Sequence, residues 1–239
     1  MALTRRPAVR PRLQKLLKRR RRFGELRPLE PPNMLRRTGS QVAVVRRHFP
    51  TATDLSDEAA MRSAVLGEMR AHDLYHFACH GCADTEDPLR SRLLVHDGPL
   101  TLLDLIKERF PAARLAVLSA CETSVPDPDL PDEVISLPSA LVEAGVPGSI
   151  GSLWRVRERP TALLMARFYE LWLTEGMAPP AALGEAQRWL RDSTRAELED
   201  YSKDFLTWPR RTSKAAERLA GERTYAHPDD WAAFVYTGR

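Results

Sequence analysis

Short apolar runs separated by turn-forming residues dominate the middle of the chain. Runs of four to six apolar residues bounded by polar breaks are typical of buried strands. We therefore predict strands over residues 74–77, 114–119 and 149–154. Apolar residues at helical spacing predict helices over about 101–109 and 136–144. The alternation of strands and helices favours an α/β fold with a mostly parallel sheet flanked by helices.

Further elements are predicted on either side of these strands. The dipeptide Asp97-Gly98 suits the tight turn of a hairpin, because glycine adopts positive φ at no steric cost. We predict a helix that begins with Ser56 as its N-cap. The remaining predictions are helices over about 42–49, 160–175 and 182–190, and a last strand over 234–236.

Two of the predicted strands lead into reactive side chains. His80 and Gly81 follow the first strand, and Cys121 and Glu122 follow the second. The carboxyl ends of parallel strands meet at one edge of a sheet, where ligands gather. A histidine beside a cysteine favours the thiolate, which is the nucleophilic form. This pattern predicts Cys121 as nucleophile and His80 as base, with the N–H groups of Gly81 and Cys121 as an oxyanion hole.

The neighbouring residues allow other interpretations. Cys79 and Cys82 form a C-x-x-C pair, which is also a pattern of zinc and redox sites. Adjacent strand residues point to opposite faces, which argues against Cys79 and His80 binding one metal. We therefore expect neither a metal nor another cofactor, and we expect Cys79 to pack in the core. His76 falls on the same strand face as His80 by even spacing, so we expect it to be a packed neighbour that positions the pair.

Acidic and aromatic residues near the two strand ends suggest a substrate pocket. Asp84 begins one acidic segment, Glu122 follows Cys121, and a second acidic segment covers residues 127–133. We predict that Asp84, Glu122 and Trp154 line the pocket, and that these acids favour a basic substrate side chain.

Composition limits the class of protein. Three cysteines in 239 residues do not make a disulfide framework and fit a reducing compartment. No apolar run is long enough for a membrane span, and the Arg-rich start lacks the apolar core of a secretory signal. We expect a soluble, cytoplasmic protein.

Charge divides the chain unevenly. Residues 1–50 hold fifteen Lys and Arg against two acids, whereas the remainder holds twenty-one against thirty. Residues 1–38 are also rich in proline, so we expect a basic, disordered tail ahead of a folded domain over residues 39–239. Such a tail can also bind nucleic acid or an anionic membrane surface.

Five sequence blocks together resemble one family. The residues that carry the resemblance are 76–81 (HFACHG), 118–123 (LSACET), 144–156 (AGV and GSLWRV), 168–169 (FY) and 227–234 (HPDDWAAF). In this order they are similar to the CHAT family, the caspase-like domains often found beside tetratricopeptide repeats. The family is related to caspases and separases in clan CD of the cysteine peptidases.

The resemblance implies a caspase-like three-layer α/β sandwich in which His80 is the catalytic histidine and Cys121 the nucleophile. It implies a bacterial cysteine endopeptidase that cleaves a protein substrate. The alternative is a non-catalytic caspase-like scaffold that binds a partner protein. Strand-forming sequence usually opens the family's domain, and here the basic tail takes that place, so we expect an edge strand to be absent. Any regulatory or repeat-containing arm is then expected on a partner protein.

Overall fold

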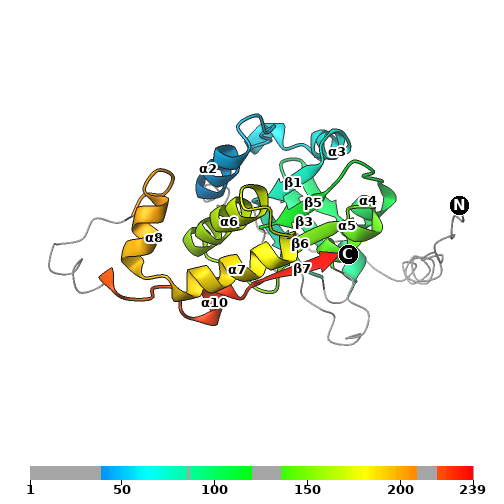
Figure 1. The fold of residues 1–239 in the computed structure, drawn as a ribbon. Helices are drawn as coiled ribbons and strands as arrows, with labels where there is room; N and C mark the ends of the chain where they lie inside the picture. The colour runs from blue at the N-terminus through cyan, green and yellow to red at the C-terminus, as the bar shows by residue number, and fades with distance from the viewer. Residues whose placement is uncertain (1–38, 85–86, 120–135, 209–219, 239) are drawn as a thin grey trace, which may run out of the picture. The chain divides into compact units, whose positions relative to one another are not determined.

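A computed structural model of the chain describes residues 39–84, 87–119, 136–208 and 220–238 (Figure 1). The α-helices are α2 (Gly39–His48), α3 (Arg62–Ala71), α4 (Leu102–Lys107), α5 (Leu137–Glu143), α6 (Glu158–Leu173), α7 (Pro179–Asp192), α8 (Arg195–Ser202) and α10 (Pro228–Trp231). The strands are β1 (Leu74–Phe77), β2 (His80–Cys82), β3 (Arg92–Val95), β4 (Gly98–Thr101), β5 (Leu115–Leu118), β6 (Gly148–Ser152) and β7 (Phe234–Gly238). Two 3₁₀ turns, η3 (Asp57–Ala59) and η4 (Pro88–Arg90), lie between them.

The larger sheet has four strands in the order β1-β5-β6-β7. β1 runs parallel to β5, with Leu74 opposite Leu115 and Phe77 opposite Leu118. β6 is also parallel to β5, whereas β7 returns antiparallel beside β6. The prediction of a mostly parallel sheet is therefore confirmed. Parallel strands need both faces covered, which explains why β5 is buried along its whole length.

Helices cover both faces of this sheet and give it three layers (Figure 1). Successive residues of a strand point to opposite faces. Leu115 and Val117 of β5 therefore share a face, and both belong to the core formed with α6 and α7. Ala116 and Leu118 face the other way, where α5 packs against the sheet and α4 packs against α5. The architecture is consistent with a caspase-like sandwich.

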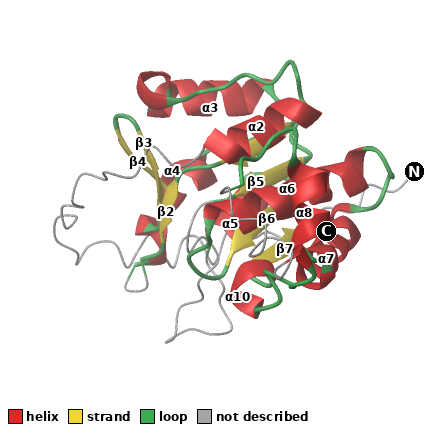
Figure 2. Ribbon diagram, turned by 90° about the vertical axis from the view of Figure 1, so that its left-hand side faces the viewer, coloured by secondary structure: helices red, strands yellow, loops and turns green. Residues whose placement is uncertain are grey.

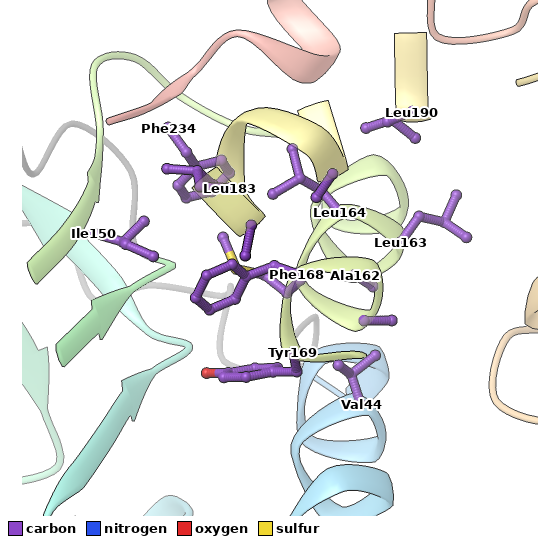
Figure 3. Close-up of a cluster of buried hydrophobic side chains, with 14 of the residues drawn as sticks. Val44, Ile150, Ala162, Leu163, Leu164, Phe168, Tyr169, Leu183, Leu190 and Phe234 are labelled. Carbon is purple, nitrogen blue, oxygen red and sulfur yellow. The ribbon is translucent and has the colours of Figure 1, made fainter. Parts of the chain in front are cut away.

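Helix α6 forms the centre of the core on the first face (Figure 3). Ten of its sixteen residues are buried because α2, α7 and the sheet surround it. Phe168 and Tyr169 are both fully enclosed, and Ile150 and Phe234 meet the helix from β6 and β7. Removing this much apolar surface from water stabilises the fold by about 25 cal/mol per Å². The helix is therefore the main anchor of the sheet on this side.

A second, antiparallel sheet in the order β2-β3-β4 lies apart from the first (Figure 2). The predicted hairpin is present, and Gly98 has a φ of +128° at the end of its turn. α4 begins directly after β4, because the side chain of Thr101 accepts a hydrogen bond from the N–H of Asp104. Asp104 in turn accepts from the N–H of Thr101, which completes a capping box.

The predicted N-cap at Ser56 is wrong. α3 begins only at Arg62, with Met61 before it. The Ser56 hydroxyl donates to Asp54 at 2.6 Å, and Asp57 has a φ of +49°, which breaks helical geometry at this point. No helix in the described part of the chain combines the length and apolar character needed to cross a membrane.

Candidate active site

The chain changes sheets directly before His80. β1 ends at Phe77, which pairs with Leu118 in the larger sheet, and β2 begins at His80, which pairs with Leu94 in the smaller one. The prediction that His76 and His80 lie on one face of one strand is therefore wrong. Strand alternation holds only along one continuous strand, and residues 78–79 form a connection between two.

The carboxyl ends of β1 and β5 are nevertheless neighbours, as the sequence pattern requires. Phe77 and Leu118 are the last residues of their strands and lie opposite each other. His80 is half-buried, and Gly81 lies opposite the buried Leu93 in β3. Cys121 and Glu122, the other two predicted site residues here, lie outside the described residues. What the structure describes is thus the strand edge and the histidine.

Ser119 is the polar side chain that follows β5. It is 5% exposed, and its hydroxyl has no hydrogen-bond partner among the described residues. Most buried hydroxyl groups are hydrogen-bonded, because an unsatisfied one costs about 1–3 kcal/mol. The position of Ser119 directly after β5 puts it at the strand edge of the candidate site.

His76 holds the end of β1 through two polar contacts. Its Nδ1 lies 2.7 Å from the hydroxyl of Tyr169 in α6, and its Nε2 lies 3.4 Å from Oε1 of Gln41 in α2. An amide oxygen only accepts hydrogen bonds, so Nε2 carries the proton and Tyr169 donates to Nδ1. Burial lowers the pKa of His76 to about 4 and raises the pKa of Tyr169. Both groups are therefore neutral at physiological pH.

This network agrees with the expected role of His76 as a packed neighbour. Gln41 and Tyr169 were not identified from the sequence as its partners, because both are remote along the chain; the FY block that includes Tyr169 indicated only the family resemblance.

Asp84 stabilises the turn after β2. Its carboxylate accepts a hydrogen bond from the N–H of Asp87 at 3.0 Å and lies 3.7 Å from Nε of Arg90. Its own N–H donates to the hydroxyl of Ser91 at 3.0 Å. The carboxylate predicted to line the pocket therefore already has partners within the protein.

Trp154 lies just beyond the carboxyl end of β6. Its indole N–H donates to the carbonyl oxygen of Asp229 at 3.2 Å, and its ring packs against the core around α6. These contacts join the end of β6 to α10. The structure thus gives Trp154 a packing role, and its predicted role in a pocket stays a prediction.

The two described cysteines are half-buried thiols that are not joined to each other. Cys82 contacts the carbonyl oxygen of Ala83 at 3.6 Å. Within the described ranges, no three His, Cys, Asp or Glu side chains are grouped closely enough to hold a metal ion.

The block at residues 227–234 lies near the carboxyl end of β6, where Trp154 contacts Asp229. The carboxylate of Asp230 is 2% exposed and pairs with Arg157, which precedes α6 and whose Nε lies 2.7 Å away. His227 caps α10 by accepting the N–H of Asp229 at 3.3 Å. A buried carboxylate needs such a partner, because its desolvation is costly. The block therefore fixes α10 against the start of α6.

Comparison with known proteins identifies the family of the chain. No curated protein matches the sequence. The CHAT domain family matches residues 4–239, which is nearly the whole chain and includes both predicted reactive residues. The neighbouring carboxyl ends of β1 and β5, with His80 directly beyond the first, agree with the caspase-like fold of that family. The chain belongs to the CHAT domain family.

Proposed function

We propose that this protein is a CHAT-type cysteine endopeptidase that cleaves a protein substrate with Cys121 and His80. One observation carries the proposal. β1 and β5 are parallel neighbours whose last residues, Phe77 and Leu118, lie opposite each other. His80 follows Phe77 by three residues, and Cys121 follows Leu118 by three residues. Paired strands lie about 4.8 Å apart, and an extended chain covers at most about 3.6 Å per residue, so three residues beyond each strand are enough for the two side chains to meet. The segments that lead to the two reactive residues thus start from the ends of adjacent strands.

The chemistry needs a base and a nucleophile at one substrate carbonyl. In the proposed reaction, the imidazole of His80 takes the thiol proton of Cys121, and the thiolate attacks the carbonyl carbon of the scissile peptide bond. The N–H groups of Gly81 and Cys121 donate to the oxyanion of the tetrahedral intermediate. His80 then returns the proton to the leaving amine, and an acyl-enzyme remains. Water, deprotonated by His80, hydrolyses that thioester and restores the thiol.

Hydrogen bonds and strand pairing on either side of His80 support it in this role. The His76–Tyr169–Gln41 network fixes the end of β1, four residues before His80. Antiparallel pairing with Leu94 and Leu93 fixes the backbone of His80 and Gly81. Catalytic groups act efficiently when their supporting shell holds them rigidly. Both ends of the connection that precedes His80 are thus anchored.

Peptidase assays on matched variants test the proposal. The wild type should cleave members of a quenched fluorescent peptide library, and Cys121→Ala and His80→Ala should each lose at least about 10³-fold in kcat/KM. Cys79→Ala and His96→Ala remove the same residue types elsewhere and should keep the activity. Circular dichroism establishes that every variant is folded.

Two outcomes oppose the proposal. Cleavage that persists in both Cys121→Ala and His80→Ala would exclude this dyad. A folded wild type that cleaves no library member, and whose Cys121 reacts no faster than Cys79, would favour the alternative of a scaffold that binds a partner protein.

A further inference from the structure

Arg92 in β3 carries a buried charge that has no acidic partner within the described part of the chain. It is 7% exposed, and Nη1 donates to the carbonyl oxygen of Arg90 at 3.3 Å. No carboxylate of the described residues lies within ion-pair distance of its guanidinium group. Arg90, two residues earlier, has Asp84 beside it at 3.7 Å. Burying a guanidinium group is costly unless an anion compensates it, so Arg92 is expected to have a function that requires its charge.

The strand register puts Arg92 beside His80. In the antiparallel pairing of β2 with β3, His80 lies opposite Leu94 and Cys82 lies opposite Arg92. Directly opposite residues share a face of the sheet, and so do residues two apart on one strand. His80 and Arg92 are thus diagonal neighbours on one face, with Cβ atoms about 7–8 Å apart or slightly less. A bound group that contacts the imidazole is within reach of the guanidinium.

The face that they share is the less buried one of the small sheet, although Arg92 itself is 7% exposed. Leu93 and Leu100, on the opposite face of the small sheet, are both fully buried. His80, Cys82 and Leu94 are only half-buried. An extended substrate that approaches His80 therefore meets the face that carries Arg92.

We propose that Arg92 binds the carboxylate of an aspartate or glutamate near the scissile bond of the substrate, and so selects acidic sites. This inference rests on the proposed peptidase function and adds a specificity residue to it. The guanidinium group is planar and can donate two parallel hydrogen bonds to a carboxylate, which compensates both charges. The substrate class is an acidic segment of a protein.

Arg92 favours the opposite preference to the one predicted from Asp84, Glu122 and residues 127–133, of which only Asp84 lies within the described residues. A basic substrate side chain would need a carboxylate that is available to it. Asp84 instead accepts from the N–H of Asp87 and lies beside Arg90. A basic side chain would also meet the positive charge of Arg92, and that repulsion disfavours it. Arg92 therefore selects an acid against both a neutral and a basic residue.

Paired peptides that differ only as Asp and Asn test the proposal, because the two side chains have nearly the same shape. The pair is made at each of the four positions before the cleavage site. At one position the wild type should prefer Asp by about 10- to 100-fold in kcat/KM, the range expected for a hydrogen bond to a charged group. Arg92→Met should reduce the ratio to within about three-fold while cleavage of the Asn peptide persists.

Arg90→Met is the matched control. It removes the same charge two residues away and should keep the Asp preference. Arg92→Lys keeps the charge but lacks the planar guanidinium group, so this variant should keep only part of the Asp preference. Equal cleavage of Asp and Asn peptides at every position by the wild type, or an unchanged ratio in Arg92→Met, would overturn the proposal and leave the peptidase function standing.

Binding to a Cys121→Ala variant separates specificity from chemistry. Fluorescence polarisation with the same peptide pairs should show tighter binding of the Asp peptide, by about 10-fold or more, and no difference when Arg92→Met is added. The binding test remains valid if the wild type cleaves neither peptide. Equal affinities for the Asp and Asn peptides would refute the role of Arg92.

Stability supplies the last control. Removing an uncompensated buried charge should leave the melting temperature of Arg92→Met unchanged or raise it. A large fall in melting temperature together with equal loss of both substrates would show a purely structural role and overturn the proposal.

Discussion

Lowering the pH from 7 to 5 should destabilise the fold through His76. The imidazole accepts a hydrogen bond from Tyr169 and donates one to Gln41, so its neutral form fits the site and its protonated form does not. Burial lowers its pKa from 6.5 to about 4. Between these two values the unfolded chain binds a proton that the folded chain does not. The stability contributed by neutral His76 is therefore complete above pH 6.5 and is lost as the pH falls towards 4.

The size of the effect follows from the two pKa values. Protonation of the unfolded state at pH 5, with the folded state still almost neutral, lowers the free energy of unfolding by about 2 kcal/mol relative to pH 7. His76 keeps part of its surface exposed, so this is the upper end, and about 1 kcal/mol is the lower. Either value is a substantial part of the stability of a domain of this size.

Denaturant unfolding at pH 7, 6 and 5 measures the effect. Carboxylates also titrate in this range, so the informative quantity is the difference between the wild type and His76→Asn. Asparagine offers an oxygen to the Tyr169 hydroxyl and does not titrate. The wild type should lose about 1–2 kcal/mol more than His76→Asn between pH 7 and 5. The exposed His96→Asn is the control and should follow the wild type, whereas identical losses in all three proteins would refute the reasoning.

Two further predictions concern the ends of helices that flank the site. Thr101→Ala removes the side chain that caps α4 and should cost about 1 kcal/mol in urea unfolding, while Thr101→Ser should cost less than half of that; equal costs would show that the cap is not responsible. Gly145 ends α5 with a φ of +106°, so Gly145→Ala should cost about 1–2 kcal/mol, although a Cβ there would be 3.9 Å from the nearest atoms of Phe110. Gly67→Ala lies inside α3 with nothing within 4 Å and should stabilise by about 0.5–1 kcal/mol, and the same sign for both glycines would contradict the conformational argument.

Local signals were sufficient to predict much of the sheet and its hairpin. β1 occupies the predicted residues, and β5 lies within the predicted range. The predicted Asp97-Gly98 turn is also present, because it depends on residues adjacent in sequence, and so does the Thr101 cap that the structure shows. A short apolar run, a positive φ and a capping hydroxyl act within a few residues of where they occur, which makes them readable without knowing the tertiary structure.

The change of sheet before His80 was not predictable in this way. Residues 76–79 continue an apolar run, and nothing in them shows that the strand ends at Phe77. What ends it is the pairing of His80 with Leu94, a residue that becomes its partner only through the fold of the hairpin. The helix predicted from Ser56 was wrong for a more local reason, since Asp54 binds the hydroxyl that would have capped it.

Some residues of the candidate site could be identified from the sequence and others could not. His80 and Gly81 were identifiable from the polar break after an apolar run, and the CHAT resemblance added their expected roles. The contact of Tyr169 with His76 and the role of Arg92 were not identifiable. Tyr169 meets His76 from 93 residues away, and the importance of Arg92 depends on its burial beside His80, whereas an arginine in a short strand usually lies at the surface.

The central claim, that His80 activates Cys121 as a nucleophile, is tested most directly by the alkylation rate of each cysteine. Limiting iodoacetamide at pH 7 and peptide mass spectrometry give the three rates within one sample, with Cys79 and Cys82 as internal standards. The account predicts that Cys121 reacts about ten-fold faster or more, and that His80→Ala slows Cys121 alone. Equal rates for the three thiols, or a Cys121 rate unchanged in His80→Ala, would contradict it.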